Sequence, residues 1–190
     1  MAQTNNSPTQ IVCVGSTEPY TLVDPTTGPP VVTSTYQWSV TGGGTFSGTS
    51  SGHTVNIIWG SIPGVYIVSL VATDNVTNCP SVLIDVEVTV VALPTVTATA
   101  SSVASSTFPL CDGDDLILTG GGASSYTWSD GTSAYTDGLA FTPAVGTATY
   151  TVTGTDVNGC VSTDFVSVTV NSLPTVTATA SSVASSTFPL

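Results

Sequence analysis

The 190-residue sequence contains no lysine and no arginine, and its 12 acidic residues give a formal net charge of −12. A chain without cationic side chains repels phosphate groups and anionic headgroups, because nothing offsets its own negative field. Nucleic acids and anionic membrane surfaces are therefore excluded as partners. The sequence also has no run of 18 apolar residues, so direct insertion into a membrane is not expected.

Charged residues of either sign are scarce, at 6% of the chain against about 25% in an average domain. Residues that favour helices, namely Glu, Lys, Leu and Gln, are scarce or absent. The most abundant residues are Thr, Ser, Val, Ala and Gly. Apolar residues still make up 41%, which is enough for packed cores. The composition predicts an all-β protein with almost no helix.

Groups for catalysis are also few. The single histidine, His53, lies in a stretch of Gly and Ser, and no Lys or Arg exists to clamp an anionic substrate. Glu18 and Glu87 stand alone in the sequence, and the clustered acidic residues lie in expected turns. We therefore expect that the protein is not an enzyme.

One segment of the chain is present twice. Residues 93–110 and 173–190 both read LPTVTATASSVASSTFPL, which is an identity over 18 residues at a spacing of 80. Such a period indicates a tandem array. Residues 173–190 are then the start of a further repeat, and the chain is expected to be part of a longer protein.

Alternating apolar and polar residues between Gly, Pro and Asp clusters predict two parallel series of short strands. The first lies near 11–14, 20–23, 34–40, 54–59, 65–72 and 82–91, and the second near 95–100, 116–119, 125–128, 139–142, 147–154 and 161–170. Strands of this length and spacing predict two tandem immunoglobulin-like β-sandwich domains, at 1–92 and 93–172.

The aromatic residues recur at matching places in the two domains. A Tyr-x-Trp motif supplies Trp38 and Trp128, and a later strand in each domain carries Tyr66 or Tyr150. A sandwich fills its centre with such a tryptophan and packs such a tyrosine near a corner. All four are expected in the cores, and stacking on a sugar is the alternative.

The four cysteines are Cys13, Cys79, Cys111 and Cys160, and none belongs to a CxxC pair or a His-rich stretch. This pattern argues against zinc and favours two disulfides formed in an oxidising compartment. Spacing within each unit predicts the pairs Cys13–Cys79 and Cys111–Cys160. Each bridge would staple one end of a sandwich and contribute roughly 4 kcal/mol to stability.

One acidic cluster follows Cys111, at Asp112, Asp114 and Asp115. A Cys111–Cys160 bridge would bring these carboxylates beside Asp156, and converging hard oxygen ligands suit Ca²⁺. The alternative is that the aspartates serve only as turn residues. No other cofactor is expected.

Longer segments of the chain resemble known families. The segments CDGDDLILTGGGASSYTWSDG and TATYTVTGTDVNGCVSTDFVSVTVN resemble the Ig-like repeats of very large surface adhesins of gliding bacteria, which type IX secretion exports. The PKD-like domains that alternate with such repeats are similar to CVGSTEPYTLVD, YQWSVTGGGTFSG and PGVYIVSLVATDNVTNC. The resemblance implies a β-sandwich array on the bacterial surface and no catalytic residues.

Two functions remain open. The chain is either a structural segment of a stalk, fibre or surface appendage, or a module that binds a glycan or protein through loops at the sandwich ends. Short Pro-containing junctions predict a semi-rigid rod in which neighbouring repeats are the main partners. The segment 173–190 is expected either to pack against the end of the second domain or to complete a sheet of another copy in a filament.

Overall fold

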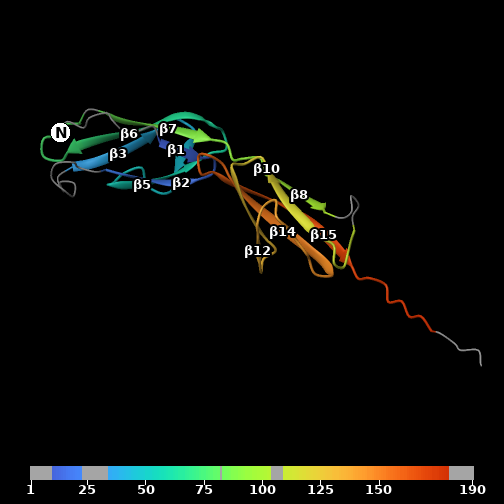
Figure 1. The fold of residues 1–190 in the computed structure, drawn as a ribbon. Coiled ribbons are helices and arrows are strands. Elements are labelled where there is room, and N and C mark those ends of the chain that lie inside the picture. The colour runs from blue at the N-terminus through green and yellow to red at the C-terminus, as the bar shows by residue number, and fades with distance from the viewer. Residues whose placement is uncertain (1–9, 23–33, 82, 104–108, 180–190) are drawn as a thin grey trace, which may run out of the picture.

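The computed structural model describes residues 10–22, 34–81, 83–103 and 109–179. These residues form two β-sandwiches placed end to end, with the chain passing once from the first to the second (Figure 1). The described residues contain no helix, and so no helix that could cross a membrane. The all-β, tandem-sandwich architecture predicted from composition and strand spacing is confirmed.

The first domain consists of a four-stranded and a three-stranded sheet. The larger sheet has the order β1-β7-β6-β3, and the smaller has the order β2-β5-β4. The strand bounds are β1 Gln10–Cys13, β2 Thr17–Thr21, β3 Ser34–Val40, β4 Gly44–Phe46, β5 Thr54–Trp59, β6 Gly64–Asp74 and β7 Ile84–Val91. Strand β1 runs parallel to β7, while the other pairs are antiparallel.

The second domain repeats this plan with a five-stranded and a three-stranded sheet. Their orders are β12-β11-β14-β15-β9 and β13-β10-β8. The bounds are β8 Thr97–Ser102, β9 Leu110–Cys111, β10 Leu116–Gly121, β11 Ser125–Ser129, β12 Ala134–Tyr135, β13 Ala140–Phe141, β14 Gly146–Thr155 and β15 Val161–Asn171. The short β9 is parallel to the end of β15, as β1 is to the end of β7.

Alternation along the strands produces the two cores. In β5, every second residue is buried, so that Val55, Ile57 and Trp59 face the interior. The first core extends from Val12 to Val90 and the second from Val96 to Val170. Each core therefore lies within one sandwich. It is built from the side chains that face inward, because successive side chains of a strand point to opposite faces.

The structure places Trp38 and Trp128 in equivalent core positions. Trp38 pairs with Leu70 and Trp128 with Val152, and both tryptophans are buried. Tyr150 is also buried, whereas Tyr66 is only half-buried, stacks on Trp59 and donates its hydroxyl proton to Ile62 O.

Tyr66 and Tyr150 are not equivalent residues. Tyr66 lies two positions after Gly64, at the end of the sandwich, and Tyr150 lies four positions after Gly146, nearer its centre. Tyr66 therefore packs against the first core, as expected, but from a half-buried place at the sandwich end.

Residues 173–179, where the repeated segment begins again, are exposed and form no strand. In the second domain the same sequence becomes β8 because β10 pairs with it over six residues. Within the described part of the chain no second strand faces residues 173–179, and a lone segment cannot satisfy its backbone groups by itself. The expectation that the segment packs on the end of the second domain is therefore wrong for these residues, and 180–190 lie outside the described residues.

Candidate functional site: the junction between the two domains

The junction is the short segment between Val91, where β7 ends, and Thr97, where β8 begins. Its last residues are held tightly by the second domain. Val96 is buried beside Gly154, where an added Cβ would lie 2.6 Å from its side chain. At Gly122 (φ +82°) an added Cβ would lie 1.8 Å from Thr95 O. Only glycine fits at these two positions, so they fix the path by which the chain enters the second domain.

A disulfide crosses this junction. It joins Cys13 of the first domain to Cys160 of the second, across 147 positions in the sequence, with the Cα atoms 5.6 Å apart. Cys79 and Cys111 are free thiols, and both are exposed. The predicted pairs Cys13–Cys79 and Cys111–Cys160 are therefore wrong, since the one disulfide among the described residues links the two domains.

Strand direction explains the pairing in the first domain. Because β1 is parallel to β7, Cys13 lies opposite Val91, at the junction. Cys79 lies in the turn that leads into β7, at the other end of the sandwich. The eight residues of β7 separate these ends by about 26 Å, and a disulfide requires Cα atoms within about 7 Å.

The second domain shows the same separation. Cys160 directly precedes β15, which begins at the junction, whereas Cys111 pairs with Asn171 where β15 ends. The 11 residues of β15 place about 36 Å between the two cysteines. Cys160 thus lies within reach of Cys13 and far from Cys111.

Asp156 organises the turn that presents Cys160. Its Oδ1 accepts hydrogen bonds from the backbone N–H of Asn158 at 2.8 Å and of Cys160 at 2.9 Å. Gly159, at φ +84°, supplies the left-handed residue that closes the turn. The result is a rigid hairpin whose cysteine is almost fully buried at the junction.

The calcium hypothesis is corrected by the same geometry. Asp112, Asp114 and Asp115 follow Cys111 at the far end of the second domain, while Asp156 lies at the junction. Asp114 instead accepts the Cys111 N–H at 2.8 Å, and Asp115 accepts the Thr142 hydroxyl at 2.6 Å. Within the described part of the chain, no three His, Cys, Asp or Glu side chains converge as metal ligands.

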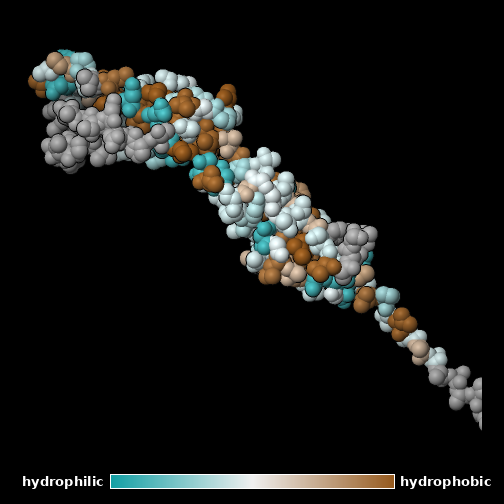
Figure 2. Space-filling model, turned by 45° about the horizontal axis from the view of Figure 1, so that its top comes forward, coloured by the Kyte–Doolittle hydropathy of each residue, from teal (hydrophilic) through white to brown (hydrophobic). Residues whose placement is uncertain are grey.

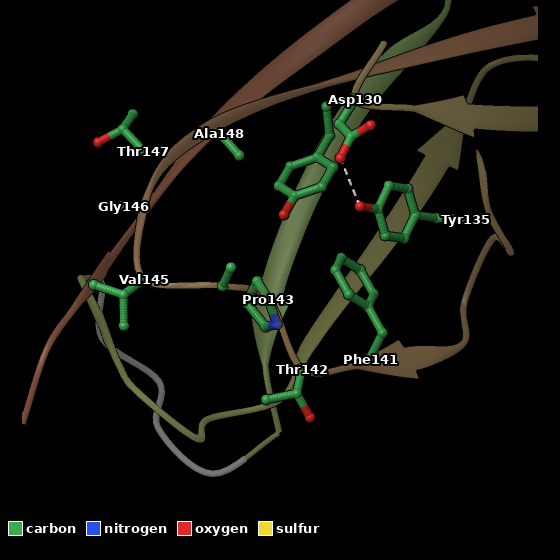
Figure 3. A pocket seen from close by; sticks show the side chains of 11 residues that line it. Asp130, Tyr135, Phe141, Thr142, Pro143, Val145, Gly146, Thr147 and Ala148 are labelled. Atoms are coloured by element: carbon green, nitrogen blue, oxygen red, sulfur yellow. Dashed lines mark hydrogen bonds between the residues drawn. The ribbon is translucent and has the colours of Figure 1, made fainter. Parts of the chain in front are cut away.

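A second feature is a shallow groove of about 320 Å³ at the far end of the second domain (Figure 3). Three aromatic rings line it. The centroid of Tyr135 lies 4.4 Å from that of Phe141 and 5.2 Å from that of Tyr150. The Thr142–Gly146 loop forms one wall of the groove, and Asp130 closes it beside Tyr135.

The groove has its own electrostatics. Hydrogen bonds from the Ser133 backbone, the Tyr135 hydroxyl and Thr132 hold the pKa of Asp130 well below its usual range. Burial, and then the Asp130 carboxylate, raise the pKa of Tyr135 to about 12. Burial also raises the pKa of Tyr150. The carboxylate is therefore negative and the phenols are neutral at physiological pH.

Asp130 of the groove and the junction residues Gly122 and Gly154 were not predicted from the sequence. A signal existed for Gly122, because it ends a run of glycines at 120–122, and glycine at a strand often marks a close approach of two backbones. His53, the one histidine, makes an edge contact with Tyr36 at 5.0 Å between centroids.

No protein-family model matches the sequence, and neither does any curated protein sequence. Several solved structures are similar at low identity. Fibronectin(III)-like modules of Clostridium thermocellum CbhA share 17% identity at a TM-score of 0.39, over 92% of this chain and 98% of theirs. The insect immune protein hemolin shares 17% identity at a TM-score of 0.33, over 88% of this chain and 45% of its own. The human desmocollin-1 ectodomain shares 14% identity at a TM-score of 0.31, over 92% of this chain and 38% of its own.

Proposed function

We propose that the chain is a structural segment of a long extracellular protein, in which tandem Ig-like domains form the stalk or fibre of a bacterial adhesin or surface appendage. The observation that carries this proposal is the Cys13–Cys160 disulfide, which fixes two sandwiches end to end. A covalent tie between neighbouring domains serves a spacer, because it limits the angles that the junction can adopt. Among the strands that the structure describes, extensive contacts occur only within each domain, so the disulfide and the held linker are the main restraints.

Composition supports the same function. A disulfide persists in oxidising, extracellular surroundings. The surface that Figure 2 presents on the second domain is mostly pale, as expected from Thr, Ser, Ala and Gly, and it carries no positive charge. The identical segments at 93–110 and 173–190 are typical of an array that grew by duplication. The resemblance to adhesins of gliding bacteria, which type IX secretion exports, fits an assignment to the bacterial cell surface.

The experiment measures rigidity directly. Cys79 and Cys111 lie at the outer ends of the pair and are exposed, so a mixture of donor and acceptor dyes can be attached without new cysteines. In the oxidised chain we expect one narrow distance distribution by single-molecule energy transfer. The double variant Cys13→Ser/Cys160→Ser is expected to broaden it. A broad distribution in the oxidised native chain would contradict the spacer function.

A second candidate function is ligand binding at the aromatic groove. Three rings in tilted and edge-on contact beside a carboxylate form a surface suited to the face of a sugar ring. The groove also lies among loops at a sandwich end. Binding to a panel of neutral glycans, lost on Phe141→Ala and kept in Phe46→Ala of the first domain, would support this function. Equal binding by both variants would exclude the groove.

A further inference from the structure

The four cysteines occupy only two kinds of position, and the first kind is the end of the strand parallel to the last strand. Cys13 lies opposite Val91, and Cys111 lies opposite Asn171. The next residue donates its N–H to that same partner's carbonyl, at 2.9 Å in the first domain and 2.8 Å in the second. The cysteine carbonyl accepts a hydrogen bond from the third residue after it in both, at 3.1 and 3.0 Å.

The second kind of position is the hairpin before the last strand, at Cys79 and Cys160. In each domain an aspartate begins the turn and donates its N–H to the cysteine carbonyl, at 3.1 Å for Asp74 and 3.0 Å for Asp156. The residue before the cysteine has a positive φ, 56° at Asn78 and 84° at Gly159. Cys79 is thus the hairpin cysteine of the first domain.

The observed disulfide joins one position of each kind. It connects the strand-end cysteine of one domain, Cys13, to the hairpin cysteine of the domain that follows, Cys160. Cys111 is the next strand-end cysteine. It lies exposed at the far end of the second domain, although Leu110, the residue before it, is fully buried. The hairpin cysteine of its own domain is already bonded.

The chain also leaves the two domains by the same route. From Val91, opposite Cys13, it continues through Ala92 to Leu93 and Pro94, and from Asn171, opposite Cys111, through Ser172 to Leu173 and Pro174. The residues that enter the second domain, 93–110, are the residues repeated at 173–190. A domain that begins with this segment would meet Cys111 as the second domain meets Cys13.

We propose that Cys111 forms a disulfide with the hairpin cysteine of the Ig-like repeat that follows it. This deepens the proposed function and rests on it, because it makes the Cys13–Cys160 bond one member of a series that runs along the array. The partner is specified by chemistry and place: a thiol in an Asp-initiated hairpin, preceded by a left-handed residue, in a domain that starts with the repeated segment.

The bond forms by thiol–disulfide exchange. The Cys111 thiolate attacks a sulfur of a small-molecule disulfide and releases one thiol. The hairpin thiolate then attacks the mixed disulfide at the Cys111 sulfur and releases the second thiol. Two protons and two electrons leave the cysteines and reduce the oxidant to two thiols. The linker holds the second cysteine at an effective concentration on the order of millimolar, which favours this partner over a separate chain.

The test extends the chain by adding residues 111–172 after Leu190, which completes a second copy of the second domain. In the added copy Val161→Ile, at an exposed position, marks the hairpin by mass. The protein is oxidised with a mixture of oxidised and reduced glutathione, and the remaining free thiols are alkylated. It is then cleaved on the N-terminal side of aspartate, because the chain has no Lys or Arg at which trypsin could cut. Cys111 is then in fragment 85–111, whose mass differs from that of the fragment that carries the added copy of Cys111. Cys160 is in the unmarked fragment 156–163.

We expect fragment 85–111 linked to the marked hairpin fragment, and fragment 1–23, which carries Cys13, linked to the unmarked one. The Cys13–Cys160 link shows in the same digest that the native junction has formed. Given that link, alkylated Cys111, or Cys111 bonded to any other cysteine, would overturn the proposal. Such a result would leave the rigid-spacer function intact if the distance distribution of the 190-residue chain stays narrow. A broad distribution would contradict the spacer function instead.

Discussion

Tyr135 donates its phenolic proton to Asp130 across 2.7 Å, at the edge of the aromatic groove (Figure 3). The other oxygen of this carboxylate accepts the N–H groups of Ser133 and Thr132 at 2.7 and 2.8 Å. The turn between β11 and β12 is therefore closed around one ionised side chain. Both the turn and the groove wall depend on that charge.

Lowering the pH should therefore destabilise the second domain through Asp130. Its pKa in the folded state is depressed, so its stabilising contribution is present above the unfolded value near 4 and is lost as the pH falls below it. Asp130→Asn should be less stable than the native chain at pH 7, and the difference should narrow between pH 4 and 2. Thermal melts across this range measure it. Asp112→Asn, at an exposed carboxylate with no hydrogen bond among the described residues, is the control, and an equal pH dependence in both variants would contradict the prediction.

Asp137 connects a core tryptophan to a neighbouring strand. One of its oxygens accepts the Trp128 indole N–H at 2.8 Å and the Gly120 N–H at 2.7 Å. Asp137→Ala leaves both donors without a partner and should lower the free energy of unfolding by about 3 kcal/mol. Asp137→Asn keeps an acceptor oxygen and should cost about 1 kcal/mol. Urea denaturation followed by Trp128 fluorescence in a Trp38→Phe/Trp59→Phe background measures both, and equal losses would refute the acceptor role.

The buried Tyr20 and the partly buried Tyr126 should respond in opposite directions to removal of the hydroxyl. The Tyr20 hydroxyl is buried and forms no well-aligned hydrogen bond among the described residues, although the nearby Trp59 indole partly offsets the rise that burial causes in its pKa. Tyr20→Phe should therefore stabilise the first domain by up to about 1 kcal/mol. The Tyr126 hydroxyl donates to Ala123 O at 2.6 Å and accepts from its N–H at 2.8 Å. Tyr126→Phe should therefore destabilise the second domain by about 1 to 2 kcal/mol. Chemical denaturation compares them, and a loss in both variants would show that Tyr20 has a partner in solution.

Alkaline pH should weaken the fold between pH 10 and 12. Burial raises the pKa of Tyr20 to about 12, and the pKa of Tyr135 is also raised to about 12. Unfolded tyrosine ionises near pH 10, so the folded state retains a proton that the unfolded state loses, and stability falls as the pH rises through this window. The chain has no Lys or Arg to titrate there. Denaturation with the free thiols alkylated measures the slope, which Tyr20→Phe should reduce, and a flat profile would contradict it.

The strands could be predicted from sequence because their alternation is local. β5 and β14 show this alternation plainly. Trp38 and Trp128 occupy their expected places because a large apolar residue in a central strand is buried in the core. Tyr66 shows the limit, since a shift of two residues along β6 moves a side chain from the centre to the end of the sandwich.

The disulfide could not be predicted from spacing, because spacing says nothing about which ends of strands meet. Cys13 and Cys79 belong to one unit, yet the parallel pairing of β1 with β7 places them at opposite ends. The predicted calcium site was wrong for the same reason, since Asp115 and Asp156 lie at opposite ends of β15. The information needed was the parallel placement of β1 beside β7 and of β9 beside β15, which depends on contacts between residues about 60 to 80 positions apart.

The Cys13–Cys160 bond also decides how the protein would respond to tension. A pull on the two ends of the chain passes from Cys13 through the sulfur atoms to Cys160 and along β15, so the residues between these cysteines carry none of it through their backbone. The bypassed stretch of 147 positions corresponds to about 500 Å of extended chain. A covalent tie of this design limits how far the two domains can lengthen under load, and only a reductant would release the bypassed stretch.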